Sequence, residues 1–145
     1  METLLISACL MGFNCKYNGG NNALPKDVLQ ALRRRYRLIP VCPEVAGGLP
    51  TPRVPSERLG NRVVSRDGQD VTAEFQRGAE LAAKLAARFD AHLALLKSNS
   101  PSCGSGTIYD GSFSGMLMSG DGVTTEYLKN NNLIIFVNHS ILLAK

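Results

Sequence analysis

Four short apolar runs, separated by segments with helical periodicity, constrain the fold of this chain more than any other feature. The runs lie at residues 4–10, 37–42, 92–98 and 133–138. They show no polar alternation, which is typical of strands buried on both faces of a sheet. Helices are predicted between them over residues 25–37, 70–89 and 122–131. This order predicts an α/β fold: a single three-layer Rossmann-like domain over residues 1–145 with a mainly parallel sheet.

The segment 70–89 carries the clearest helical pattern. Its recurring positions are apolar and small in the middle, with Gly78 and Ala82 at the centre of the face, so this helix is expected to lie close to the sheet. Asp70 or Thr72 is the expected cap at its start, because a side-chain oxygen there accepts a bond from a free helix amide. Two turn signals, Asp67-Gly68 and Asp110-Gly111, lie in Gly-rich segments and indicate hairpins or ordered functional loops.

Composition limits the partners of the protein. No apolar run approaches the ~18 residues of a membrane span, and the first ten residues lack the basic start and long apolar core of a signal peptide, so a cytoplasmic location is expected.

The net charge of +4 is modest. The basic run RRRYR at 33–37 ends a predicted helix and is interpreted as a solvated face, which makes tRNA a possible but not a favoured partner. His92 and His139 have no partner pattern and are expected to be structural.

The cysteines follow the strands. Cys9 closes the first apolar run, Cys42 closes the second, and Cys103 lies in the loop after the third. The carboxyl ends of parallel strands share one edge of a sheet, where ligands bind in open α/β folds, so these three thiols are expected to meet. Cys15 lies in the loop after the first strand, near the same edge but less constrained.

A cluster of reduced cytosolic thiols favours metal binding or catalysis over a disulfide. No C-x-x-C pair is present, which argues against a zinc knuckle or a thioredoxin-type redox site. Three thiolates from separate loops can hold a tetrahedral zinc ion, or three irons of a cubane cluster whose fourth iron is open. Spacing alone does not distinguish these two possibilities.

Five motifs carry a resemblance to a known family. They are CLMGFNCKYNGG, PVCPEVAGGLPTPR, DGQDVTAEFQRGA, SPSCGSGTIYDGSFSG and GDGVT, which occur in this order between about residues 6 and 128. Together they are similar to the motif series of the thiouracil desulfurase family, formerly a bacterial domain of unknown function. The chain departs from that series at Asn18, where the family commonly has an aspartate.

The resemblance implies an enzyme that removes sulfur from thiouracil or thiouridine compounds without net redox chemistry. It implies a [4Fe-4S] cluster held by Cys9, Cys42 and Cys103, with one open iron, and catalytic acid and base roles for Glu44 and Ser100. The alternatives are a non-catalytic iron-sulfur or sulfur carrier and a structural zinc domain.

Residue chemistry fits these roles. Glu44 is two residues from Cys42 and can act as a base toward water, with Glu57 or a bound water as the alternative. Ser100 can pass a proton toward the ring nitrogen of the substrate. Arg53 and Ser102 are predicted substrate contacts, and a hydrogen bond to a cluster sulfur is the alternative for Ser102. Arg53 is suited to a carbonyl or phosphate, although a solvated loop arginine explains it about as well.

Overall fold

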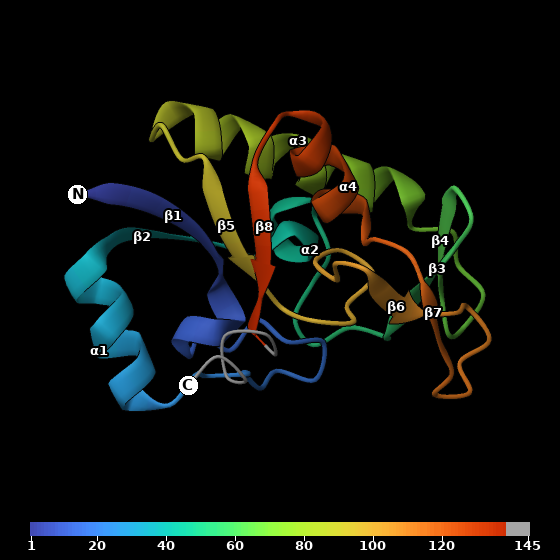
Figure 1. Ribbon diagram of the computed structural model, residues 1–145. Helices are drawn as coiled ribbons and strands as arrows, with labels where there is room; N and C mark the ends of the chain where they lie inside the picture. Colours follow the sequence, from blue (N-terminus) through green and yellow to red (C-terminus); the bar gives the residue numbers. More distant parts are fainter. Residues whose placement is uncertain (139–145) are drawn as a thin grey trace.

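The central sheet of the protein is parallel throughout. The computed structural model describes residues 1–138, and its main sheet has the strand order β2-β1-β5-β8. The strands are β1 (Glu2–Ser7), β2 (Tyr36–Val41), β5 (Leu93–Leu96) and β8 (Ile134–Val137). All three neighbouring pairs are parallel (Figure 1). The predicted α/β class and mainly parallel sheet are therefore confirmed.

Helices cover the sheet on both faces (Figure 1). They are the 3-10 helix η1 (Ala8–Met11) and the α-helices α1 (Lys26–Arg35), α2 (Pro43–Ala46), α3 (Thr72–Arg88) and α4 (Val123–Asn130). Alternate residues of β1 point to opposite layers. Leu4 and Ile6 pack with Val28 of α1, whereas Leu5 packs with Ala82 of α3. This alternation produces the three layers.

Two glycines bring α2 and α3 into backbone contact. A Cβ atom on Gly78 of α3 would lie 2.0 Å from the carbonyl oxygen of Pro43, and one on Gly47 would lie 1.9 Å from that of Glu74. Neither position accepts a side chain. The small centre of α3 therefore receives the short helix α2, which follows β2 directly and was not predicted as a helix.

Two antiparallel hairpins lie outside the main sheet. They are formed by β3 (Ser56–Leu59) with β4 (Arg62–Ser65) and by β6 (Thr107–Tyr109) with β7 (Leu117–Ser119). Asp110-Gly111 lies in the connection of the second hairpin, as predicted. The first hairpin turns instead at Gly60–Asn61, and Asp67-Gly68 forms the next turn, which returns Asp70 to an antiparallel bridge with Val64.

Element boundaries differ from the predicted ones by one to three residues. The helix predicted to reach residue 37 ends at Arg35, because Tyr36 adopts an extended backbone and begins β2. The N-cap of α3 is Val71, whose side chain makes no capping bond. Asp70 supplies the bond: its Oδ1 accepts the Thr72 amide at 2.9 Å, and hydrogen bonds from Thr72 lower the pKa of Asp70.

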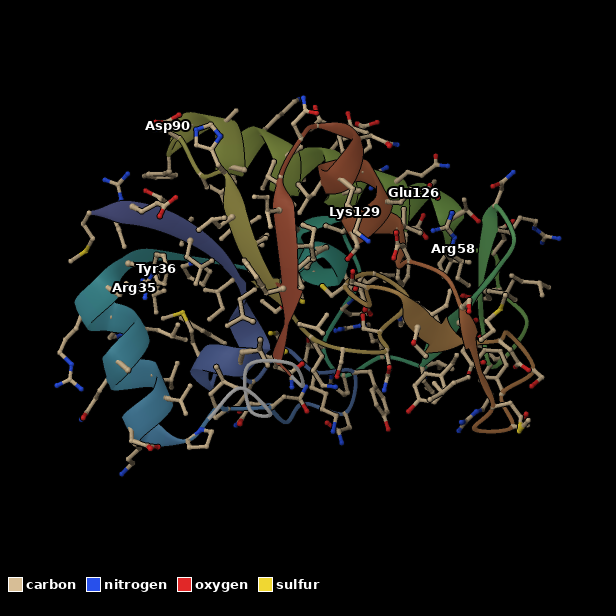
Figure 2. All side chains as sticks on the ribbon, viewed as in Figure 1. Arg35, Tyr36, Arg58, Asp90, Glu126 and Lys129 are labelled. Atoms are coloured by element: carbon tan, nitrogen blue, oxygen red, sulfur yellow. The ribbon has the colours of Figure 1, made fainter. Side chains whose placement is uncertain are left out.

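Two ion pairs illustrate how charged side chains are used outside the cavity. Arg58 of β3 reaches Glu126 of α4 at 3.2 Å, so the first hairpin is tied to α4 (Figure 2). His92 is exposed and lies 3.1 Å from Asp90, which agrees with a structural role. His139 lies outside the described residues. No helix within residues 1–138 is long and apolar enough to cross a membrane.

Candidate functional site

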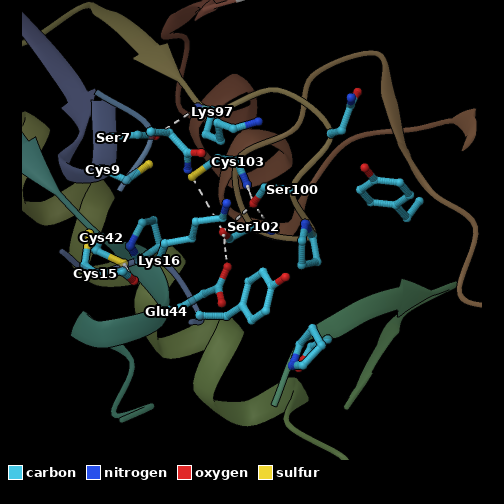
Figure 3. Close-up of a pocket in the computed structure, with 18 of the residues that line it drawn as sticks. Ser7, Cys9, Cys15, Lys16, Cys42, Glu44, Lys97, Ser100, Ser102 and Cys103 are labelled. Atoms are coloured by element: carbon cyan, nitrogen blue, oxygen red, sulfur yellow. Dashed lines mark hydrogen bonds between the residues drawn. The ribbon is translucent and has the colours of Figure 1, made fainter. Parts of the chain in front are cut away.

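A cavity of about 480 Å³ lies at the carboxyl edge of the sheet, and all four cysteines line it (Figure 3). Its floor is formed where β1, β2 and β5 end. The two hairpins contribute lining residues from farther out, among them Glu57 from the first and Tyr109 from the second. The site is thus assembled from segments that are distant in sequence.

Each cysteine occupies a defined place after a strand. Cys9 lies in η1, directly after β1. Cys42 is the N-cap of α2, directly after β2. Cys103 is buried in the loop after β5. Cys15 comes from the loop after η1, and its carbonyl oxygen lies 3.8 Å from the Cys42 sulfur. The structure therefore brings Cys15 to the cavity together with the three predicted ligands.

Burial controls the protonation of these thiols. It raises the pKa of Cys103 to about 12, against the lowering effect of hydrogen bonds with Ser7 and Ser102. It also raises the pKa of Cys15 to about 12, and the neighbouring Cys42 adds to this. The pKa of Cys9 is raised by burial as well. Thiolates in this cavity need a positive charge to stabilise them, and a bound metal supplies one.

Lys97 is a cation at the site that the sequence interpretation did not identify. It follows β5, is half-buried, and donates from Nζ to the carbonyl oxygen of Ser98 at 3.0 Å. Burial lowers its pKa, whereas the nearby Cys9 favours its charged form. The sequence interpretation placed Lys97 inside the strand predicted over residues 92–98, whereas β5 ends at Leu96. A charged residue at the carboxyl end of a buried apolar run was the available signal.

Glu44 enters the cavity from the first turn of α2, paired with Arg53. The Nε of Arg53 donates to Oε1 of Glu44 at 3.0 Å. The guanidinium also donates to Pro50, Thr51 and Cys15 through its other nitrogens. Arg53 lines the cavity, but these bonds direct its donors to the protein. Its side chain is 7% exposed, so it is not a solvated loop arginine.

The second carboxylate oxygen of Glu44 contacts the serine loop (Figure 3). Ser102 donates from Oγ to Oε2 at 2.9 Å, and the hydroxyls of Ser102 and Ser100 are 2.9 Å apart. Ser100 Oγ also accepts the amides of Ser102 and Cys103 at 3.1 and 3.0 Å. The structure therefore connects the two predicted catalytic residues through Ser102, which is 2% exposed.

The start of α4 fixes this loop. A Cβ atom on Gly122 would lie 2.4 Å from the Ser102 carbonyl carbon, and the Thr124 amide bonds to the Ser102 carbonyl oxygen at 2.9 Å. The glycine of the GDGVT motif thus permits close packing of α4 against the loop. Because the first amides of α4 bond to the loop, they are not available to a free anion.

Glu57 also lines the cavity, but its carboxylate holds the second hairpin. Its Oε1 accepts the amides of Gly111 and Phe113 at 3.0 and 3.1 Å. These bonds occupy the oxygen that faces the loop of the second hairpin. Of the two carboxylates, Glu44 is the one connected to Ser100.

The cysteine thiols are the side chains of this cavity that could bind a metal group. Within residues 1–138 no three Cys, His, Asp or Glu side chains are arranged to hold one metal ion. A tetrahedral zinc ion requires its ligands to converge at about 2.3 Å from one point. In an iron-sulfur cluster each cysteine binds a different iron, so the thiols stand farther apart around a shared cavity. The donors here are free thiols from separate segments that line one cavity, and their chemistry suits such a cluster.

Comparisons with known proteins agree with the motif series. The family model for 2-thiouracil desulfurase matches residues 4–140. The chain belongs to the 2-thiouracil desulfurase family. The resemblance inferred from the motifs is therefore confirmed, and with it the prediction of a desulfurase enzyme.

Two known proteins are similar to this chain over most of its length. A solved structure named [4Fe-4S]-dependent thiouracil desulfidase TudS is 46% identical, covers 99% of both chains and superimposes with a TM-score of 0.92. The Bacillus subtilis (strain 168) protein named "Uncharacterized protein YbbK" is 40% identical over 136 residues, which are 87% of this chain and 89% of that protein. The similarity to TudS extends over the whole desulfurase fold described above.

Proposed function

We propose that this protein is a [4Fe-4S]-dependent desulfidase that hydrolyses the carbon–sulfur bond of thiolated uracil compounds without net redox chemistry. The products are sulfide and the corresponding uracil compound. The observation that carries the proposal is the connection of a cavity lined by free cysteines with a carboxylate and two serine hydroxyls. Membership of the family and the likeness to TudS support the cofactor and the substrate class.

Cys9, Cys42 and Cys103 are the proposed cluster ligands. Each follows a different strand of the sheet, and all three line the same cavity, so together they would hold the cluster. Three protein ligands leave one iron open. When bound, the cluster supplies this iron as a Lewis acid for the sulfur of the substrate. Cys15 borders the cavity next to Cys42 and is proposed to be dispensable for cluster binding.

Glu44 is the proposed base. Its side chain is 16% exposed, so water reaches it while the protein fixes its orientation. Arg53 holds one carboxylate oxygen and Ser102 holds the other. A carboxylate fixed at both oxygens keeps its position when it accepts a proton from water, which is the geometric requirement for a general base. The resulting hydroxide attacks the ring carbon that carries sulfur.

Ser100 is the proposed acid toward the ring nitrogen. Two amide N–H groups point at its Oγ. These donors stabilise negative charge on the oxygen as its proton leaves, as the donors of an oxyanion hole do. Ser100 is half-buried and lines the cavity, so its hydroxyl faces bound substrate.

The substrate is proposed to be a small molecule: a thiolated uracil base, nucleoside or nucleotide. The cavity volume falls in the range typical of small-molecule sites, about 300–1,000 Å³. Tyr17, Tyr109 and Phe113 are among its lining residues and offer aromatic faces to a planar base. Arg53 and Ser102 both bond to Glu44, so we propose that their contribution to substrate turnover is made through that carboxylate. A tRNA substrate is not favoured.

A cytoplasmic location is proposed with this function. All four cysteines are free thiols, and the cytosol keeps thiols reduced. A carrier that binds sulfur without turnover needs no fixed carboxylate, so the Arg53–Glu44–Ser102 arrangement favours an enzyme.

Anaerobic purification followed by absorption spectroscopy and a sulfide assay tests the function. A brown protein with broad absorbance near ~400 nm and four irons per chain is expected for the cluster. Sulfide release is then measured with 2-thio and 4-thio substrates as base, nucleoside, nucleotide and tRNA. A colourless protein with stoichiometric zinc, or a brown protein that releases no sulfide from any of these compounds, contradicts the proposal.

A further inference from the structure

We propose that Ser102 is a positioning residue that connects Glu44 to Ser100, so that the three side chains act as one proton-transfer unit. The inference rests on the proposed function and reassigns Ser102, which the sequence predicted to touch substrate. It is carried by the hydrogen bonds around the two serines. No other residue bridges Glu44 and Ser100 among the bonds of the described chain.

The direction of the hydrogen bonds follows from the number of lone pairs. A hydroxyl oxygen accepts two hydrogen bonds and donates one. Ser100 Oγ accepts the amides of Ser102 and Cys103, so its third contact, 2.9 Å to Ser102 Oγ, is a donation. Ser102 then donates its single proton to Glu44 Oε2. The Cys103 sulfur is a competing acceptor but lies at 3.6 Å, and a carboxylate at 2.9 Å forms the stronger bond.

This arrangement links the two proton transfers of the proposed reaction. Glu44 takes a proton from water, and the carboxylic acid so formed can donate to Ser102 Oγ. For the transfer, Ser100 turns its O–H from Ser102 to the ring nitrogen and releases its proton there. The lone pair freed on Ser100 Oγ, the third beside the two that accept amides, then takes the proton of Ser102, which Glu44 replaces. Each residue ends with the proton count it began with, and one proton has moved from water to the substrate. One hydroxyl, that of Ser102, thereby connects the base and the acid of the reaction.

The surroundings of Ser102 are suited to this task. Its side chain is 2% exposed, so solvent does not compete for its hydrogen bonds. The backbone is held by α4 through Gly122 and the Thr124 amide. A side chain enclosed in this way has little access to substrate, whereas its two shortest hydroxyl contacts, each 2.9 Å long, are with the proposed catalytic residues.

Kinetics of the iron-loaded protein tests the connection. Ser102→Ala is expected to lower kcat at least about tenfold, with unchanged KM and unchanged calorimetric affinity for uracil. The double variant with both Ser102→Ala and Ser100→Ala is expected to lose no more kcat than the more damaging of the two single variants. The effects of residues that act as a unit do not add. Ser105→Ala is the matched control: it lies in the same loop but does not line the cavity, and wild-type kinetics are expected.

Infrared spectroscopy supplies a readout that is independent of turnover. The carboxylate band of Glu44, identified by its absence in Glu44→Gln, is expected to shift in Ser102→Ala and not in Ser105→Ala. If Ser102→Ala does not hold iron, Ser102→Thr takes its place and, because it keeps the hydroxyl, is expected to retain kcat within about tenfold.

Three results overturn the inference: near wild-type kcat in Ser102→Ala, weaker uracil binding with unchanged kcat, or an unshifted Glu44 band. A fully iron-loaded Ser102→Thr that loses kcat also contradicts it. If the proposed desulfidase function is wrong, the wild-type protein releases no sulfide. The infrared comparison still tests the hydrogen bond between Ser102 and Glu44 in that case.

Discussion

The Nε atom of Arg53 lies 3.0 Å from Oε1 of Glu44, and the two side chains are only 7% and 16% exposed. The pair joins the loop before the first hairpin to the first turn of α2. The same guanidinium bonds to the carbonyl oxygen of Cys15 at 2.9 Å, so it also fixes the loop that brings Cys15 to the cavity. One arginine thus positions the proposed base and one wall of the cysteine site.

Arg53→Lys is expected to lower sulfide release by about 10²-fold, the low end of the effect of a general base. Lysine keeps the charge but cannot reproduce the planar, multiply bonded guanidinium. Breaking a buried pair typically costs about 3–5 kcal/mol when one partner is removed, so thermal denaturation should show a smaller loss for lysine than for Arg53→Met. Arg62→Lys, at an exposed pair with Asp70, is the control; an equal effect there would contradict a specific role for Arg53.

Glu44→Gln and Ser100→Ala are each expected to keep the cluster and lose about 10²- to 10⁴-fold in the rate of sulfide release. Neither side chain is assigned to iron, whereas each has a stated role in moving a proton. Iron content, absorbance and sulfide release are measured on the same samples. Near wild-type release by Glu44→Gln with full iron content would remove Glu44 as the base.

Serine substitutions of the cysteines are expected to separate ligands from neighbours. Cys9→Ser, Cys42→Ser and Cys103→Ser should each lose most of their iron, because the thiolate and not the alcohol is the cluster ligand. Cys15→Ser should retain the cluster. Iron and sulfide are counted after anaerobic reconstitution. Equal iron loss in Cys15→Ser and Cys9→Ser would show that the ligand assignment is wrong.

Gly78→Ala is expected to destabilise the protein and reduce activity together. The added Cβ would lie 2.0 Å from the Pro43 carbonyl oxygen, so α2 must move away from α3 and take Glu44 with it. Overpacking of this kind typically costs about 1–3 kcal/mol. Thermal denaturation and sulfide release are compared with Lys84→Ala on an exposed position of α3, where a change within about 0.5 kcal/mol is expected. Unchanged stability in Gly78→Ala would contradict the close backbone packing.

The sheet and its helices were predictable from sequence because their signals are local. The uninterrupted apolar runs require burial on both faces of a parallel sheet, and the order of the chain then places Cys9, Cys42 and Cys103 at one edge of it. The short helix α2 was missed because four residues followed by Gly47 and Gly48 carry no periodicity. Its stability comes from backbone contact with α3, which a sequence pattern does not express.

The partners of the site residues were not predictable for the same reason. Ser102 and Glu44 are 58 positions apart, and Ser100 reaches Glu44 only through that contact. Arg53 follows Glu44 by nine residues, yet its pairing depends on the loop between them folding back. The sequence interpretation assigned both Arg53 and Ser102 to the substrate because it identified polar groups near the cysteines and had no information on what those groups face.

The residues that line the cavity come from two separate parts of the fold, the central sheet and the hairpins outside it. Cys9 and Cys42 directly follow strands of the central sheet, whereas Tyr109 and Phe113 belong to the β6–β7 hairpin, which shares no strand with that sheet. A substitution at the tip of the hairpin is therefore expected to leave these two thiols in place. Evolution, or an engineer, can alter that tip to admit a different sulfur compound while the cysteines on the sheet side are retained.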